Sequence, residues 1–220
     1  MGLVELFLSG GVVMWPLLGF SLLSTTLILE RGLFWLKLSQ QQDQIIQKTL
    51  LLYSTQPQRA IETLKAHTQF PLARIFLAAL TLEQGTPDDF RLALESAAQA
   101  EMPLLKRFNT VFESIIGVSP LLGLLGTILG LMQTFSSLRL GESLTGAAGE
   151  SASNVTAGIG TALVSTAAGL LVAIATLLFA NLFLGLYRRQ RSTIESYAGR
   201  LELLYRQYYR RYLARQRSAS

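Results

Sequence analysis

The sequence predicts an all-α fold: a three-span transmembrane helical protein with long helices extending into the cytoplasm and a cytoplasmic helical loop region. Half of its 220 residues are apolar and only 15% are charged, whereas soluble domains carry about 25% charged residues. The deficit is concentrated in three uncharged runs. They lie between Glu5 and Glu30, between Glu113 and Arg139, and between Glu150 and Arg188. Because each run can cross a hydrocarbon core about 30 Å thick, a soluble enzyme is excluded.

These runs divide the chain into segments. We expect an extracytoplasmic N-terminus (1–9), transmembrane helix 1 (10–30), a cytoplasmic helical region (31–112), transmembrane helix 2 (113–135), an extracytoplasmic loop (136–154), transmembrane helix 3 (155–187) and a cytoplasmic C-terminal helix (188–220). The third span is longer than one bilayer crossing, so it is expected to tilt or to continue into solvent.

The first span begins near Gly10, and no Lys or Arg precedes it. No small-residue cleavage site follows it, so we expect an anchor and not a cleaved signal peptide. Trp15 and Trp35 stand about 30 Å apart along a helix, at about 1.5 Å per residue. That spacing suits an aromatic belt at the two headgroup levels. Packing between helices explains the two tryptophans equally well.

The distribution of Lys and Arg predicts the orientation. Of the 19 such residues, Arg139 alone lies in a segment assigned to the outside, and all others lie in 31–112 and 188–220. The positive-inside rule therefore places these two segments in the cytoplasm and the N-terminus outside. Topology explains the net charge of +5, and no nucleic acid is expected as a partner.

The cytoplasmic region contains a helix start at Thr86-Pro87-Asp88-Asp89. A cap hydroxyl, a first-turn proline and first-turn acids are typical of that position, so the acid pair is not interpreted as a metal or general-acid site. We expect Pro103 to kink this helix without ending it, so that one long helix continues into span two.

The C-terminal segment carries an apolar stripe at helical spacing, which favours packing against the cytoplasmic ends of neighbouring helices; the alternative is binding to an anionic leaflet. Its members are Ile194, Tyr197, Leu201, Leu204, Tyr208 and Tyr212.

Spans two and three each carry a stripe of small and hydroxyl-bearing residues at steps of three and four. The stripes comprise Ser119, Gly123, Thr127, Gly130 and Thr134 on span two, and Gly158, Ala162, Thr166, Gly169, Ala173, Thr176 and Ala180 on span three. Gly126 and Gly130 fit small-xxx-small packing directly, and Pro120 follows Ser119. Close helix packing is the interpretation that spacing alone favours. The alternative is a narrow pore or partner-binding channel lined by Thr127 and Thr166.

Several kinds of chemistry are excluded. The chain has no cysteine and a single histidine, His67, so no disulfide, thiolate or imidazole-based metal site is expected. The string GLLGTILG lacks the lysine of a phosphate loop and lies in an apolar run. The spans offer no acid or base. We therefore expect no catalytic residue, no metal and no cofactor.

Three strings resemble one family. SPLLGLLGTILGLMQTF (119–135) resembles a signature of the ExbB/TolQ/MotA proton-channel family, in which Pro-Leu-Leu-Gly-Leu-Leu-Gly-Thr opens a transmembrane helix. GIGTALVSTAAGLLVAI (158–174) resembles that family's second signature, and WPLLGFSLLSTTLILERGLFW resembles its first span. With three spans, the chain is similar to the ExbB/TolQ branch and not to the four-span flagellar stator branch.

The resemblance implies a multi-pass subunit of the bacterial inner membrane that forms a pentameric ring, in membrane lipid, around an ExbD-like dimer of single-span proteins. In that family proton flow moves one component against the other, and a TonB-like protein transmits the work to the outer membrane. The titratable aspartate belongs to the ExbD-like helix. Thr127 and Thr166 match the two threonine positions that face this carboxylate, so the resemblance favours a lumen-lining role for both.

One position departs from the pattern. Many relatives carry a glutamate directly before the Ala-Leu of the second signature, where this chain has Thr161. A hydroxyl cannot replace a carboxylate as a proton acceptor near neutral pH, although it can hold a water. Either the carboxylate is dispensable, or this subunit conducts differently.

Other functions stay open. A TolQ-like envelope-maintenance motor would use the same architecture, and a non-conducting scaffold would only cluster partner helices. A small-solute transporter should show internal repeats or broken helices with polar contacts, and the sequence has neither.

Overall fold

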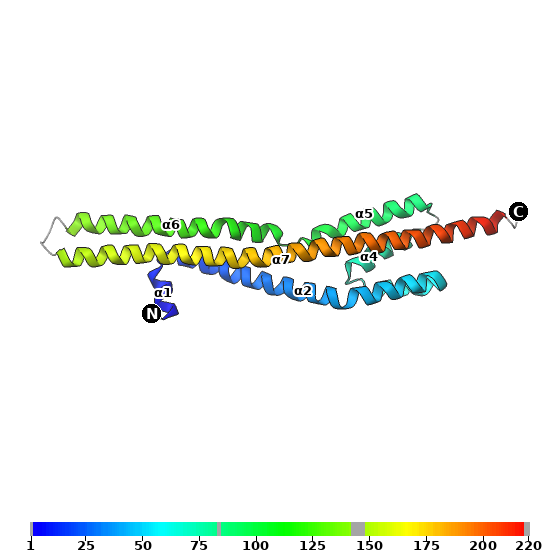
Figure 1. The fold of residues 1–220 in the computed structure, drawn as a ribbon, viewed down its shortest axis with the longest axis horizontal. Coiled ribbons are helices and arrows are strands. Elements are labelled where there is room, and N and C mark those ends of the chain that lie inside the picture. Colours follow the sequence, from blue (N-terminus) through cyan, green and yellow to red (C-terminus); the bar gives the residue numbers. More distant parts are fainter. Residues whose placement is uncertain (1, 83–84, 142–147, 218–220) are drawn as a thin grey trace. The chain divides into compact units, whose positions relative to one another are not determined.

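The structure, a computed structural model, describes residues 2–82, 85–141 and 148–217. All regular elements in this part of the chain are α-helices (Figure 1). They are α1 (Leu3–Ser9), α2 (Met14–Thr55), α3 (Pro57–Lys65), α4 (Pro71–Leu80), α5 (Pro87–Leu105), α6 (Asn109–Gly141) and α7 (Ala148–Arg217). Three helical stretches are long and apolar enough to cross a membrane: Met14–Thr55, Pro87–Ser136 and Gly158–Arg211. The expected all-α, three-span fold is confirmed.

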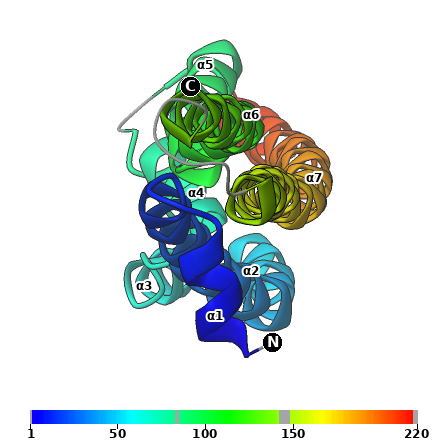
Figure 2. The same ribbon diagram turned by 90° about the vertical axis from the view of Figure 1, so that its left-hand side faces the viewer.

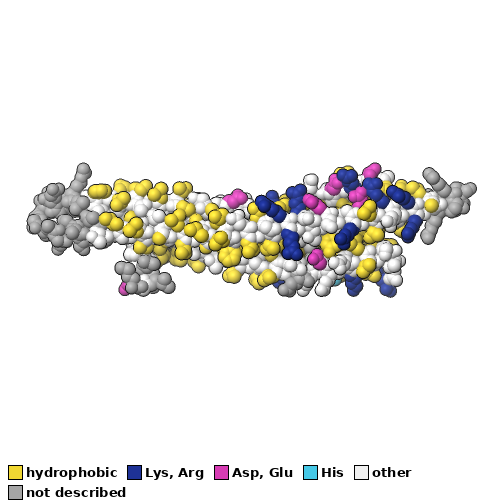
Figure 3. Space-filling view, in the orientation of Figure 1, with side chains coloured by type: hydrophobic (Ala, Val, Ile, Leu, Met, Phe, Trp, Pro, Cys, Tyr) yellow, Lys and Arg dark blue, Asp and Glu magenta, His cyan; other side chains and the backbone are white. Residues whose placement is uncertain are grey.

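The chain divides into two compact units. Unit 1 comprises Met1–Glu30 and Phe108–Leu182, and unit 2 comprises Arg31–Arg107 and Phe183–Ser220. Helices α2 and α7 each contribute residues to both units. Hydrophobic side chains dominate the visible face of unit 1, whereas most of the visible Lys and Arg side chains belong to unit 2 (Figure 3). The middle of the expected outer loop, residues 142–147, and the last residues, 218–220, lie outside the described residues.

The expectation of one long helix through Pro103 is wrong. Helix α5 ends at Leu105, residues 106–108 form a turn, and α6 begins at Asn109. Phe108 has a φ of 68°, which lies in the left-handed region and is incompatible with a continuing right-handed helix. Pro103 therefore lies in the last turn of α5, where its missing N–H and its ring weaken the helix just before the break.

The predicted start of α5 is confirmed. The Thr86 hydroxyl accepts a hydrogen bond from the Asp89 backbone N–H at 3.2 Å, and the Asp89 carboxylate accepts one from the Thr86 backbone N–H at 2.9 Å. This reciprocal capping box satisfies two backbone donors that the first helical turn leaves open.

The core of unit 2 is built from large side chains on short helices. Phe76 of α4 and Phe90 of α5 are fully buried. An ion pair joins these helices, because Arg74 Nε donates to Glu101 Oε1 at 2.7 Å. This hydrogen bond raises the pKa of the Arg74 guanidinium. Tyr205 of α7 stacks on Phe90, with ring centroids 4.0 Å apart.

The C-terminal stripe packs within unit 2, as the sequence analysis favoured, over most of its described length. Ile194, Tyr197 and Leu201 are buried, whereas Tyr208 is 56% exposed; the Tyr212 side chain lies outside the described residues. The two tryptophans differ. Trp35 is only 6% exposed, so packing explains it, while Trp15 is 64% exposed, as a residue of an aromatic belt would be.

Candidate functional site

In unit 1, α6 and α7 run side by side (Figures 1 and 2). Their small-residue stripes face each other. A methyl group on Gly123 of α6 would lie 3.0 Å from the Ser165 carbonyl oxygen, and one on Gly169 of α7 would lie 2.5 Å from the Ser119 carbonyl oxygen. At such distances a Cβ would force the two backbones apart. Glycine is therefore required for this approach, which is the usual device for packing membrane helices.

The same contact continues toward the other end of unit 1. A methyl group on Gly130 would lie 2.9 Å from the Gly158 carbonyl oxygen, and one on Gly126 would clash with the Ser165 side chain. Thr134 is buried and donates its hydroxyl to the Gly130 carbonyl at 2.9 Å. Close packing thus explains most of both stripes. The buried members are Ser119, Gly123, Gly126, Gly130, Thr134, Ala162 and Gly169; Pro120 and Gly158 are half-buried.

Thr166 lies beside Gly123, on which a methyl group would come within 3.0 Å of the Thr166 Cα. Its hydroxyl donates to the Gly123 carbonyl at 3.2 Å, and its side chain is half-buried. Thr127 lies one turn from Gly123, is also half-buried, and donates to the Leu124 carbonyl of its own helix at 2.5 Å. A threonine hydroxyl that donates to a carbonyl keeps its acceptor capacity. Each hydroxyl can therefore accept a further hydrogen bond on its partly open side.

Thr161 is not grouped with Thr166. Five residues turn an α-helix by about 140° beyond a full circle, so the two side chains point to different sides of α7. Thr161 is half-buried, and a methyl group on Gly11 would lie 3.3 Å from its Cγ2. Thr161, at which the sequence analysis noted a departure from the family pattern, therefore faces the segment that precedes α2.

Ala173 and Thr176, farther along α7, are buried as well. The Thr176 hydroxyl donates to the Val172 carbonyl at 2.7 Å, and Ser24 of α2 lies 2.7 Å from the Thr176 oxygen. Because the Thr176 proton is engaged, Ser24 is the donor. Thr176 thus joins α7 to α2.

Sequence reasoning missed Ser24 and Ser165. Ser165 is fully buried and donates to the Ala162 and Gly123 carbonyls, at 3.0 and 3.4 Å. Both serines lie in apolar runs, where spacing alone does not show which carbonyl or hydroxyl a serine meets. For Ser165, the small residues three and four positions away on both sides are the signal that was available.

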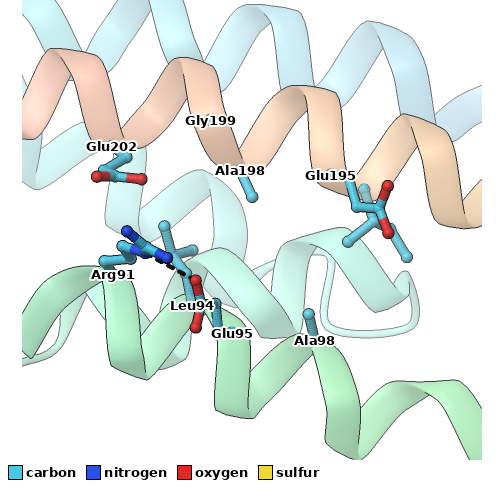
Figure 4. A pocket seen from close by; sticks show the side chains of 9 residues that line it. Arg91, Leu94, Glu95, Ala98, Glu195, Ala198, Gly199 and Glu202 are labelled. Carbon is cyan, nitrogen blue, oxygen red and sulfur yellow. Dashed lines mark hydrogen bonds and ion pairs between the residues drawn. The ribbon is translucent and has the colours of Figure 1, made fainter.

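Unit 2 has an open cleft between α5 and α7, with Leu94, Ala98 and Ala198 on its walls (Figure 4). Three carboxylates, of Glu95, Glu195 and Glu202, also line it, and each accepts a hydrogen bond from an arginine four residues away on its own helix, at 2.7–2.9 Å. These are surface ion pairs of small energy. Among the described residues, no group of three or more His, Cys, Asp or Glu could hold a metal ion.

Comparison with known proteins decides the family. The model of the MotA/TolQ/ExbB proton channel family matches residues 67–196, which include α4, α5, α6 and a large part of α7. The chain belongs to this family.

Relatives in the MotA/TolQ/ExbB family match between 74% and 93% of the chain. It is 58% identical, over 92% of its length and 94% of the relative's, to the putative biopolymer transport protein ExbB-like 3 of Synechocystis. It is 39% identical over 93% of its length to the putative biopolymer transport protein ExbB-like 1 of Synechocystis, which it covers to 80%. It is 32% identical over 74% of its length to the biopolymer transport protein exbB1 of Vibrio cholerae, of which 71% is covered. The resemblance found in the three strings is confirmed, and the chain is a multi-pass membrane protein of this family.

Proposed function

We propose that this chain is the ring-forming subunit of an inner-membrane motor that couples the proton-motive force to work such as outer-membrane transport. In this proposal the ring is a pentamer and surrounds an ExbD-like single-span partner whose aspartate carries the proton. A TonB-like protein transmits the motion. The segments 31–112 and 188–220 lie in the cytoplasm, and the N-terminus lies outside.

The position of Thr166 carries the proposal. Its hydroxyl is held on the Gly123 carbonyl at 3.2 Å, at a close contact where a methyl group on Gly123 would lie 3.0 Å from the backbone of α7. The hydroxyl is thereby oriented by the backbone of α6, while the half-buried side chain keeps acceptor capacity for a partner group. Thr127, one turn from Gly123, offers a second hydroxyl of the same kind.

The charge pattern supports a carboxylate supplied by a partner. No Asp, Glu, His, Lys or Arg lies between Glu113 and Arg139 or between Glu150 and Arg188. A hydroxyl has no pKa near neutrality and cannot itself take up and release the proton. One proton that crosses 100 mV supplies about 2.3 kcal/mol, so a few protons suffice for substantial conformational work.

A non-conducting scaffold is the second candidate, and one observation favours it. The small residues of both stripes are already used for contact between α6 and α7 of one chain, so they do not by themselves require a lumen. A TolQ-like envelope motor differs from the first candidate only in its client, and the same test applies to it.

Thr166→Val separates the motor from the scaffold, because valine keeps the volume and the β-branched shape and removes the hydroxyl. The loss of a hydrogen bond to a charged group is worth about 1.5–3 kcal/mol, so proton-coupled work should fall about 10-fold to 100-fold. Thr127→Val should act in the same direction. The readouts are proton-dependent uptake in cells and, for assembly, native mass spectrometry in mild detergent.

Thr25→Val is the matched control. Thr25 is exposed on α2 and donates only to the Ser21 carbonyl of its own helix at 2.8 Å, so uptake should be unchanged. A Thr166→Val ring that assembles and works at the wild-type rate would reject the lumen and favour the scaffold. A monomer of the wild-type chain under mild conditions would reject the ring.

A further inference from the structure

Unit 2 contains a small cavity between α2 and α7, with a volume of ≈ 80 Å³. It is lined by the first residues that each helix contributes to this unit. Its polar and charged lining residues are Trp35, Ser39, Gln42 and Asp43 of α2, and Arg189, Gln190 and Thr193 of α7.

Three residues that line this cavity each carry a buried polar side-chain atom that has no hydrogen-bond partner among the described residues. The atoms are Trp35 Nε1, Gln42 Oε1 and Gln190 Nε2, in residues that are 6%, 2% and 9% exposed. Buried polar atoms of native proteins are almost always paired, with protein or with ordered water. A polar molecule in the cavity that these three residues share would supply the missing partners.

The lining decides what kind of molecule fits. The indole N–H and the amide of Gln190 are donors, the Gln42 oxygen is an acceptor, and the Thr193 hydroxyl can be either. An anion would face the Gln42 oxygen and the Asp43 carboxylate, and a cation would face the N–H groups and the Arg189 guanidinium. The charges of Asp43 and Arg189 cancel. A small neutral molecule that both donates and accepts is favoured over either ion.

We propose that this cavity is a hydration site, in which a cluster of ordered waters bridges Trp35 and Gln42 of α2 to Gln190 of α7. At about 30 Å³ per water, the cavity holds two or three. The waters supply a polar connection between helices whose direct hydrogen bond farther along unit 2, from Gln47 Nε2 to the Tyr197 hydroxyl, is long at 3.4 Å. The site belongs to unit 2 alone and does not depend on the proposed proton-driven function.

Trp35 is a built-in reporter. The chain has two tryptophans, and Trp15→Phe leaves Trp35 as the only one. Waters on its N–H should stabilise the polar excited state of the indole. In the purified full-length protein, the Trp35 emission should therefore lie at longer wavelength than in the same protein carrying Gln42→Leu and Gln190→Leu. Gln41→Leu and Gln44→Leu, on the exposed side of α2, are the matched controls and should leave the emission unchanged.

Thermal stability gives a second readout. Gln42→Leu and Gln190→Leu should each lower the thermal midpoint by about 2–4 °C, because each leaves waters and polar atoms without a partner. The thermal midpoint of the double variant should fall by less than the sum of the two single falls, since an apolar cavity releases its waters together. The hydration site would be supported by a Trp35 emission at longer wavelength in the protein that keeps both glutamines, together with non-additive falls in the thermal midpoint.

Three results would overturn it. Equal emission in the presence and absence of the glutamines would mean that the cavity is dry. Additive thermal losses would mean that the two glutamines share no water. A lipid or other molecule that native mass spectrometry finds on the wild-type protein, and that Gln190→Leu removes, would show that the cavity binds that molecule in place of water.

Discussion

In unit 1 the closest contacts between helices are made by glycine backbones, whereas in unit 2 they are made by large side chains. Gly123 and Gly169 lie at backbone-to-backbone distances that exclude a Cβ. In unit 2, Phe76 and Phe90 fill the core, and an arginine–glutamate pair crosses from α4 to α5. The same chain thus uses two ways to hold helices together.

We infer that the difference follows from the solvent of each unit, with unit 1 in lipid and unit 2 in water. Lipid tails are as apolar as leucine, so burial of leucine gains little in a bilayer, and close approach of backbones must supply the attraction. In unit 1 large apolar side chains point outward; Leu121 is 63% exposed and Leu171 is 71% exposed. In water, burial of aromatic side chains is the main source of stability. Each prediction below tests one side of this comparison.

The largest effect is expected from Phe90→Ala in unit 2. Phe90 is fully buried and stacks on Tyr205, so its removal leaves a cavity that costs about 3–5 kcal/mol. The thermal midpoint of the detergent-solubilised protein measures this loss. Leu92→Ala is the control, because Leu92 lies on the same helix and is 66% exposed. Equal losses in the two variants would contradict an aromatic core in unit 2.

Gly169→Ala should be next in size. Its new Cβ would lie 2.5 Å from the Ser119 carbonyl oxygen, and overpacking of this kind costs about 1–3 kcal/mol. Gly160→Ala and Gly199→Ala are matched controls, one in each unit, since nothing lies within 4 Å of a Cβ at either position. They should be neutral or stabilising by about 0.5–1 kcal/mol, as alanine is a better helix former. Equal losses of stability in Gly160→Ala and Gly169→Ala would argue against backbone contact as the interaction that holds the helices of unit 1 together.

Ser24→Ala tests polar contact in unit 1 and should cost less. It removes the hydrogen bond from Ser24 to Thr176, which is 2.7 Å long and buried between α2 and α7. Such bonds in membrane proteins average about 0.6 kcal/mol and reach about 1.7. The thermal midpoint should fall slightly, whereas Thr26→Ala, in an exposed residue of the same helix, should not change it. A loss as large as that of Phe90→Ala would mean that polar contacts dominate unit 1.

The spans and the family were predictable from sequence, and the reasons are local. Uncharged runs and small residues at steps of three and four mark Gly123, Gly130 and Gly169 directly. The partner of Thr166 was not predictable, because spacing alone shows that a hydroxyl lies on a stripe but not that it meets the Gly123 carbonyl. The cluster of Trp35, Gln42 and Gln190 was also missed, since it joins residues about 150 positions apart.

The break before α6 was mispredicted for a similar reason. Pro103 is the visible helix breaker, but the turn is made by residues 106–108, where Phe108 takes a positive φ. Phenylalanine has no preference for that region. Local sequence signals alone therefore do not mark the residue at which α5 ends.

The smallest effect concerns the exposed start of α5, where neither backbone contact nor aromatic burial contributes. Hydrogen bonds from Thr86 lower the pKa of the Asp89 carboxyl. A carboxyl whose pKa is lower in the folded state stabilises that state above its unfolded pKa, and loses this contribution as the pH falls through the folded value. The contribution of this carboxylate to the stability of the folded state should therefore be constant from neutral pH down to about 4 and decline below that.

Asp89→Asn removes the charge, so the difference in thermal midpoint between this variant and the wild type should shrink as the pH is lowered from 5 to 3. A difference for Asp89→Asn that stayed constant over this range would show that the carboxylate charge does not contribute to the cap.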